Sequence, residues 1–452
     1  MFANKLLFLS LVLFSVNALA QRGNADSSKR MRYIQNQYIK VGIDLSLGGS
    51  ITYIADIKKQ ENLVNNFDWG RQVQMSFYSG PVPFEPNNKK ANKAWTFIGW
   101  NPIQSGDVAG NRSKVLDYKN TGKELYVKCI PMHWPLDNVP GECTYECWIK
   151  LDGKAVKVRS RILNNRPDTQ QYTARTQELP AVYTNAPYHR LVTYRGSKPY
   201  TRDTTSVMQN HNLPGDSSIQ WAQWQATECW AANVDENNYG LGVWNEGVQR
   251  FSGGYYGDNT FKGGSKDIAT AYIAPNSIDV LDHNIDYAYN YVLFVGSIDE
   301  IRGYVYKNTL AHLPRYNFAK TRCQWSYDNT TDKGWPLQNS LQIYAKKNGA
   351  LISPLTFWNA SDAAKIVIKG SWPVGIKQAR IYWQAHAEKG FVEPQSKAFD
   401  VVDDGEMHSY TVDLAGAEGY KGQITGIKIL LNDNRDAGSV DVVTIASVNL
   451  AK

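Results

Sequence analysis

The stretch Cys143-Thr-Tyr-Glu-Cys-Trp-Ile-Lys-Leu151, followed by Asp152-Gly153-Lys154 and by Ala155-Val-Lys-Val-Arg-Ser-Arg-Ile162, decides the fold class of this chain. Both arms alternate apolar and polar residues, which is the period of a strand with one buried face. An Asp-Gly pair between two alternating segments is the strongest short-range signal of a hairpin. The stretch therefore predicts a long antiparallel hairpin.

The same pattern recurs along the chain. Residues 38–45 and 124–130 alternate, and 228–234 with 239–244 predict a second hairpin around Asn237-Asn238. Long helical periodicity is absent, and only 297–306 is expected to form a short helix. Strands and turns at this spacing favour a large all-β sandwich over βαβ units.

A change of pattern divides the chain. Residues 309–314 leave the alternating pattern, and short strands with Gly- or Asp-rich turns follow Cys323. The later unit has the size of one jelly-roll. We therefore expect a large antiparallel β-supersandwich over residues 30–312 and a smaller jelly-roll β-sandwich over residues 320–452.

The first twenty residues differ in kind. Lys5, an apolar stretch over 6–16 and Ala18-Leu19-Ala20 have the order of a cleavable signal peptide, predicted for residues 1–20. A secreted or periplasmic protein follows from it. No apolar run reaches about 18 residues, so we expect no membrane insertion of the mature chain.

Composition narrows the class of protein. The chain has 452 residues, of which 42% are hydrophobic and 20% charged, so it can bury a core. Its net charge of +7 includes no block typical of a nucleic-acid arm, so no nucleic acid is expected as partner. Aromatic residues reach 12%, and such rings stack on the C–H faces of sugars.

The five cysteines leave their pairing open. Cys143 and Cys147 lie about 13 Å apart along one strand, too far for a mutual disulfide. Either can bond Cys129 across a hairpin, or all are buried thiols. No Cys or His spacing typical of zinc accompanies them, so we expect no metal and no cofactor.

Two stretches resemble known families. Gly48-Gly49-Ser50-Ile51 followed by Asn65-Asn66-Phe67-Asp68-Trp69-Gly70-Arg71-Gln72 resembles the opening of galactose-mutarotase-like supersandwich domains. This resemblance implies that Asn66 and Arg71 hold sugar hydroxyls. The catalytic His pair of sugar mutarotases has no clear counterpart, which argues against a simple aldose epimerase.

The second resemblance covers the C-terminal unit. The order of Trp372, Trp383, Phe399, Tyr410 and the final strand over 440–450 is similar to accessory jelly-roll modules of secreted polysaccharide-degrading enzymes. Together the two resemblances imply a carbohydrate-active protein.

Sugar chemistry requires carboxylates, and Glu178 is the best candidate for a catalytic acid or base. It stands before an apolar run, and such surroundings raise the pKa of a carboxyl. Asp68 is expected to lie on a strand beside Arg71, with Trp69 stacking on sugars and Gln72 holding hydroxyls.

The second predicted hairpin carries further candidates. Glu228 with Trp230 and Glu246 with Trp244 lie on its two arms, where cross-strand neighbours come within about 5 Å. We expect either carboxylate to act as the second acid and either indole to stack on a ring.

The segment after Glu178 adds the last candidates. Tyr183 and Tyr188 are expected to bind substrate, and His189 is the candidate catalytic histidine. These residues lead to a glycoside hydrolase acting on a polysaccharide or oligosaccharide. Two alternatives remain open: a polysaccharide lyase that uses Tyr188 or His189 with Arg71 on a uronate, and a non-catalytic glycan-binding protein.

Overall fold

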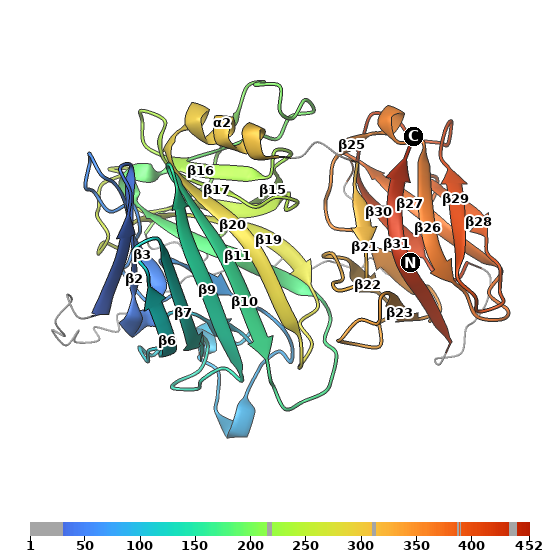
Figure 1. Cartoon of the computed structure of the whole chain (residues 1–452), viewed down its shortest axis with the longest axis horizontal. Coiled ribbons are helices and arrows are strands. Elements are labelled where there is room, and N and C mark those ends of the chain that lie inside the picture. The colour runs from blue at the N-terminus through green and yellow to red at the C-terminus, as the bar shows by residue number, and fades with distance from the viewer. Residues whose placement is uncertain (1–29, 215–218, 310–312, 387, 389, 434–440) are drawn as a thin grey trace.

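The computed structural model of the chain describes residues 30–214, 219–309, 313–386, 388, 390–433 and 441–452. The predicted signal peptide lies outside these residues. The described chain is almost entirely β, and its two parts lie side by side in Figure 1.

The N-terminal part is a sandwich of two large sheets. The first has eleven strands in the main order β1-β2-β3-β4-β11-β19-β18-β14. Its members are β1 (Met31–Gln35), β2 (Ile39–Asp44), β3 (Ser50–Asp56), β4 (Val73–Ser76), β5 (Pro102–Ile103), β8 (Met132–His133), β11 (Arg175–Asn185), β14 (His211–Asn212), β15 (Ala222–Gln225), β18 (Arg250–Tyr256) and β19 (Thr270–Asp279).

The second sheet has nine strands in the order β13-β12-β16-β17-β20-β10-β9-β7-β6. Its members are β6 (Lys114–Asn120), β7 (Glu124–Ile130), β9 (Cys143–Asp152), β10 (Ala155–Asn164), β12 (Arg190–Thr193), β13 (Ser206–Met208), β16 (Trp230–Val234), β17 (Tyr239–Trp244) and β20 (Asp286–Ser297). Both predicted hairpins are present, as the antiparallel pairs β9–β10 and β16–β17.

One hydrophobic core fills the space between these sheets. Met75 and Phe77 enter it from the first sheet, and Val127, Val158 and Leu293 enter it from the second. Each of these side chains follows the alternation of its strand, with the intervening residues on the outer face. The all-β supersandwich expected from the sequence is therefore the fold of this part.

One α-helix, α2 (Ile298–Asn308), follows β20 and covers one end of the nine-stranded sheet. Ser297 caps it: its side chain accepts from the Glu300 N–H while the Glu300 carboxylate accepts from the Ser297 N–H. This capping box explains why the helix begins where the sequence predicted.

The C-terminal part is a second sandwich with its own core. Its five-stranded sheet contains β21 (Arg315–Asn317), β23 (Leu341–Tyr344), β26 (Lys365–Ser371), β29 (His408–Asp413) and β31 (Val442–Ala451). Its six-stranded sheet contains β22 (Ser326–Asp328), β24 (Ala350–Ile352), β25 (Trp358–Asn359), β27 (Gln378–Ala385), β28 (Ser396–Asp400) and β30 (Gln423–Leu430).

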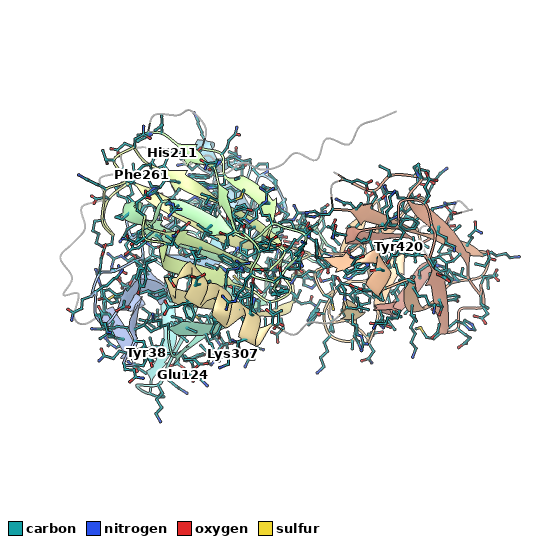
Figure 2. The ribbon with its side chains drawn as sticks, turned by 90° about the horizontal axis from the view of Figure 1, so that it is seen from above. Tyr38, Glu124, His211, Phe261, Lys307 and Tyr420 are labelled. Atoms are coloured by element: carbon teal, nitrogen blue, oxygen red, sulfur yellow. The ribbon has the colours of Figure 1, made fainter. Side chains whose placement is uncertain are left out.

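Its strand order is that of a jelly-roll. In the orders β23-β31-β26-β29 and β24-β30-β27-β28, successive strands lie in opposite sheets except for the β27–β28 pair, as two Greek keys require. Trp325, Trp372 and Trp383 fill the core between the sheets, so these indoles are structural. In the view from above, Tyr420 lies within this second body (Figure 2).

All five cysteines lie in the described part of the chain and are free thiols there. Cys129, Cys143, Cys147 and Cys229 are buried, and Cys323 is half-buried. Of the two alternatives, the structure has the buried-thiol arrangement, because burial raises the pKa of Cys129 and holds the thiol protonated.

Candidate functional site

A hollow lies on the face of the eleven-stranded sheet that points away from the core. Along β4, Val73 and Met75 pack into the core, while Gln74 and Ser76 line the hollow, as does Tyr78 just beyond the strand. The alternation of one short strand thus separates the core of the sandwich from its candidate site.

A bulge in β11 brings Glu178 and Tyr183 to the same face. In a regular strand, residues five apart point to opposite faces. The pairing of β11 with both neighbours shifts between Glu178 and Val182, so Leu179 and Val182 enter the core while Glu178, Ala181 and Tyr183 line the hollow. Bulges re-aim side chains in this way at functional sites.

Glu178 is a buried carboxyl surrounded by hydroxyl groups. It accepts a hydrogen bond of 2.6 Å from the Tyr272 hydroxyl of the neighbouring strand β19. Burial raises the pKa of Glu178, and hydrogen bonds from Tyr272, Tyr78 and Ser76 oppose that rise. A carboxyl with a raised pKa holds its proton closer to neutral pH, as a general acid requires.

Arg71 and Asp68 form the other charged pair beside the hollow. The Arg71 Nε lies 3.3 Å from Asp68 Oδ2, and Arg71 also donates to the Ile268 carbonyl. The strand expected over these residues is wrong: β4 begins at Val73, and a turn comes before it, with Gln72 at φ 82°.

Tyr183 lies between the two groups. The charges of Glu178 and Asp68 raise its pKa and that of Arg71 lowers it, while burial is the largest cause of the rise. Tyr183 also stacks on Tyr272, with ring centroids 4.8 Å apart. The structure therefore brings Asp68, Arg71 and Glu178 around one aromatic pair.

Two indoles close the hollow. Trp95 and Trp134 meet edge to face with ring centroids 5.8 Å apart. Gly70 lets Trp134 approach, because a Cβ at this glycine would lie 2.7 Å from the indole. The free volume left is about 20 Å³, space for one water. A sugar ring therefore does not fit beside Glu178 in this arrangement of the lining side chains.

Three neighbouring candidates have other contacts. Asn66 donates to the Thr52 and Val64 carbonyls, and Gln72 donates to the Asp68 carbonyl. Trp69 lies under the guanidinium of Arg112, 5.2 Å from its ring centroid. The amide N–H groups of Asn66 and Gln72 thus bind backbone, and the role of these two residues in holding sugar hydroxyls stays a prediction.

Tyr188 and His189 lie beyond the far end of β11, roughly 20 Å along the chain path from Glu178. Tyr188 is part of the core, and His189 Nε2 lies 3.1 Å from Glu236 while its ring stacks on Phe261 at 3.7 Å. Figure 2 shows Phe261 beside His211 at that end of the molecule. The lyase alternative, in which Tyr188 or His189 acts with Arg71, stays a prediction, although Tyr188 is buried in the core and His189 already has Glu236 and Phe261 as partners.

Glu228 anchors α2 and is not available to a substrate. Its side chain is fully buried, accepting from Arg302 at 3.0 and 3.2 Å, from Tyr306 at 2.6 Å and from the Trp230 indole at 2.8 Å. Trp230 is fully buried as well. Catalysis by Glu228 and stacking by Trp230 are therefore wrong, although the predicted cross-strand pairing of Trp230 with Trp244 is present.

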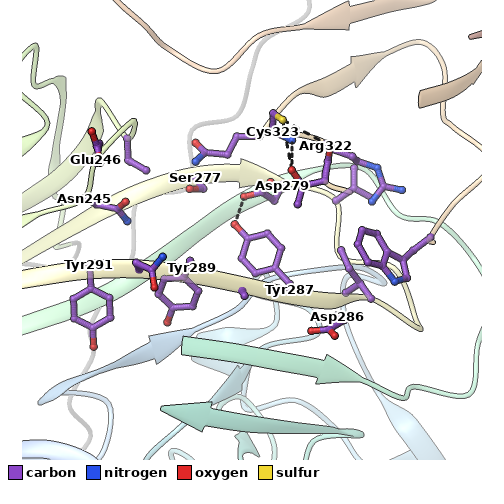
Figure 3. Close-up of a pocket in the computed structure, with 18 of the residues that line it drawn as sticks. Asn245, Glu246, Ser277, Asp279, Asp286, Tyr287, Tyr289, Tyr291, Arg322 and Cys323 are labelled. Carbon is purple, nitrogen blue, oxygen red and sulfur yellow. Dashed lines mark hydrogen bonds between the residues drawn. The ribbon is translucent and has the colours of Figure 1, made fainter. Parts of the chain in front are cut away.

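Trp244 and Glu246 line a different cavity. It lies between β20 and the first residues of the C-terminal part (Figure 3) and shares no lining residue with the Glu178 hollow. The hairpin candidates therefore do not supply a second carboxylate to the Glu178 hollow.

Several residues at the hollow were not predicted from the sequence. Trp95 and Asn101 line it and Tyr272 donates to Glu178, and all three come from segments that meet only in the folded state. The bulge in β11 left no residue pattern either. A stronger signal was missed at the other cavity, where Tyr287, Tyr289 and Tyr291 alternate on one strand.

Two absences hold for the described residues. No group of three or more His, Cys, Asp or Glu is placed there to hold a metal ion. None of the helices described is long and apolar enough to cross a membrane.

Comparison with known proteins adds information on the fold of the N-terminal part. A galactose mutarotase related enzyme from Lactobacillus acidophilus is 13% identical, covers 59% of this chain and 97% of its own, and has a TM-score of 0.36. A putative aldose 1-epimerase from Escherichia coli K12 is 9% identical over 59% and 99%, with a TM-score of 0.36. The 4-alpha-glucanotransferase of Thermococcus litoralis is 10% identical over 59% and 37%, with a TM-score of 0.31.

At such identities and TM-scores the likeness assigns no activity and no ligand. No model of a protein family matches the chain, and no curated protein matches its sequence.

Proposed function

We propose that this chain is a carbohydrate-active protein, and specifically a glycoside hydrolase acting on a polysaccharide or oligosaccharide in the Glu178 hollow. One observation carries the proposal: a buried carboxyl held by Tyr272 shares a hollow with two indoles and with Tyr183, whose pKa is also influenced by the charges of the Asp68–Arg71 pair. The signal-peptide pattern of residues 1–20 supports export of the protein to meet such a glycan.

The chemistry follows from the two carboxyls. Glu178, whose pKa is raised by burial, donates a proton to the oxygen of the leaving sugar. Asp68, held in an ion pair with Arg71, supplies the second carboxylate. Trp95 and Trp134 separate to admit the chain and then stack on its rings.

The test is Glu178→Gln, which keeps the shape of the side chain and removes its titration. We expect turnover to fall by about 10²–10⁴-fold while the circular dichroism spectrum is unchanged. The matched control is Glu236→Gln, an exposed glutamate outside the hollow, which should keep full activity. Turnover of Glu178→Gln at the wild-type rate would reject the assignment.

A non-catalytic glycan-binding protein is the second candidate. It rests on the same aromatic side chains, because Trp95, Trp134 and Tyr183 can stack on sugar rings whether or not Glu178 transfers a proton. Incubation with a panel of plant, algal and host polysaccharides separates the two. The hydrolase releases new reducing ends, whereas the binder retains glycan and releases none.

A further inference from the structure

A cavity of about 360 Å³ lies where the N-terminal sandwich meets the C-terminal part. Its floor comes from β19 and β20, and Arg322, Cys323 and Trp335 cover it from the C-terminal side (Figure 3). Its volume falls within the range of about 300–1,000 Å³ typical of small-molecule sites. It is far larger than the space beside Glu178.

Aromatic side chains form much of its wall. Tyr287, Tyr289 and Tyr291 occupy alternate positions of β20 and so share one face of that strand. Trp244 contributes from β17 and Trp335 from the loop after Asp332. Such a wall offers flat surfaces to the C–H groups of a ring.

The polar groups of the cavity are buried and fixed. Asp279 is buried and accepts a hydrogen bond of 2.7 Å from the Tyr287 hydroxyl, drawn in Figure 3. Arg322 is buried too, and its Nη1 has no hydrogen-bond partner among the described residues. The fixed Asp279–Tyr287 pair gives the aromatic wall a polar edge that a ligand hydroxyl can meet.

The charge of the cavity selects against acidic ligands. Arg322 is neutralised by Asp332 and Asp282, each with an N···O contact of 2.6 Å. Asp279, Asp286 and Glu246 add further carboxyls to the lining. Negative charge therefore exceeds positive charge, which disfavours a uronate, a sulfate or a phosphate.

We propose that this cavity is a second ligand site, distinct from the Glu178 hollow, which binds one hydroxylated ring without negative charge, as in a neutral hexose or hexosamine unit. The ring stacks on the tyrosines and Trp335, and its hydroxyls bind the carboxyls that line the cavity, Asp279 among them. The site does not depend on the hydrolase activity, and a ligand in it touches both parts of the chain.

Cys323 provides a direct readout, because it lines the cavity and is half-buried while the other four cysteines are buried. The full chain is alkylated with iodoacetamide in the presence of glucose, galactose, mannose, glucosamine or glucuronate. Modification of Cys323 is followed by mass spectrometry. At ten times its Kd, a ligand in the cavity should slow alkylation about tenfold.

Variants separate the cavity from the rest of the molecule. Trp335→Ala, with Asp279→Asn as a second variant that keeps the side-chain shape, should weaken the protection. Trp148→Ala, a half-exposed indole over which Arg159 lies on the outer face of the nine-stranded sheet, should keep it. Glu178→Gln should also keep the protection of Cys323, because it lies outside the cavity. The experiment therefore tests the second ligand site independently of the hydrolase proposal.

Saturable protection by a neutral hexose or by glucosamine, lost in the cavity variants, supports the proposal. Absence of protection by every sugar tested, equal protection by glucuronate, or full protection in both cavity variants would overturn it.

Discussion

At the scale of single residues, two buried carboxyls, Glu178 and Asp279, have closely similar surroundings. Both accept a hydrogen bond from a tyrosine hydroxyl, and burial raises the pKa of both. Their sequence neighbours differ, since one precedes an apolar run and the other ends a strand. Desolvation in the folded state makes them alike.

Asp279 should make stability depend on pH. Burial raises its pKa from 3.8 to about 6, against hydrogen bonding from Tyr287 and the charge of Arg322. Between these values the folded chain keeps a proton that the unfolded chain releases, so stability falls as pH rises through this window. The shift corresponds to about 3 kcal/mol, fully expressed above pH 6.

Asp279→Asn removes this titration. Urea unfolding at several pH values measures the free energy of unfolding of both proteins. The difference, variant minus wild type, should increase by about 3 kcal/mol between pH 3.5 and pH 7, because only the wild type is destabilised as Asp279 ionises. A constant difference over this range would contradict the assignment.

At the scale of elements, α2 shows how a candidate catalytic residue becomes a structural one. In the sequence, Glu228 lies two residues before Trp230, and this proximity to an indole made it a candidate for a sugar site. In the fold, Arg302 and Tyr306 of α2 bind it from above, so it attaches the helix to the sheet.

Glu228→Gln should therefore affect stability and not turnover. Removing one charge of a buried ion pair costs about 3–5 kcal/mol, because the Arg302 guanidinium is left buried without its partner. Urea unfolding measures this loss. Ser297→Ala, which removes the cap of the same helix, should cost about 1 kcal/mol.

Activity of the folded Glu228→Gln protein should equal that of the wild type. Loss of turnover with unchanged stability would return Glu228 to the catalytic candidates.

At the scale of the whole molecule, one buried ion pair and two more exposed hydrogen bonds join the two parts. Arg322 from the C-terminal part lies 2.6 Å from Asp282, and the Gln225 side chain donates to the Thr356 carbonyl at 2.8 Å. Asn284 donates to the Trp335 carbonyl at 2.8 Å. These contacts surround the cavity between the parts and hold its walls together.

Arg322→Ala should uncouple the two parts. It leaves Asp282 and Asp332 buried without their cation, at a cost of about 3–5 kcal/mol. Each part has its own core and can unfold separately once the link is lost. Calorimetry should therefore show two separated unfolding transitions for the variant, and transitions that lie closer together or merge for the wild type.

The control is Arg161→Ala, which removes a partly exposed pair with Asp286 within the N-terminal sandwich and should cost at most about 1 kcal/mol. A single unchanged transition in Arg322→Ala would show that Arg322 does not couple the parts.

The sequence by itself determined the local features of this protein. The alternation of apolar and polar residues predicted the strands of the 143–162 and 228–244 hairpins, and Asp152-Gly153 predicted the turn between two of them. The polar residue Ser297 marked the start of the helix. The alternation of a strand and the residue preference of a turn depend only on residues that are close in sequence. A sequence pattern can therefore predict both.

Tertiary structure alone decided which candidates meet. The bulge after Glu178 turned its side chain to the face of Tyr183, and strand pairing brought Tyr272 to it from almost a hundred residues away. The surroundings of the two buried glutamates then decided their roles. Glu228 is held by Arg302, whereas Glu178 faces a hollow. Desolvation and long-range pairing depend on what the rest of the chain places nearby, and for that reason no local pattern records them.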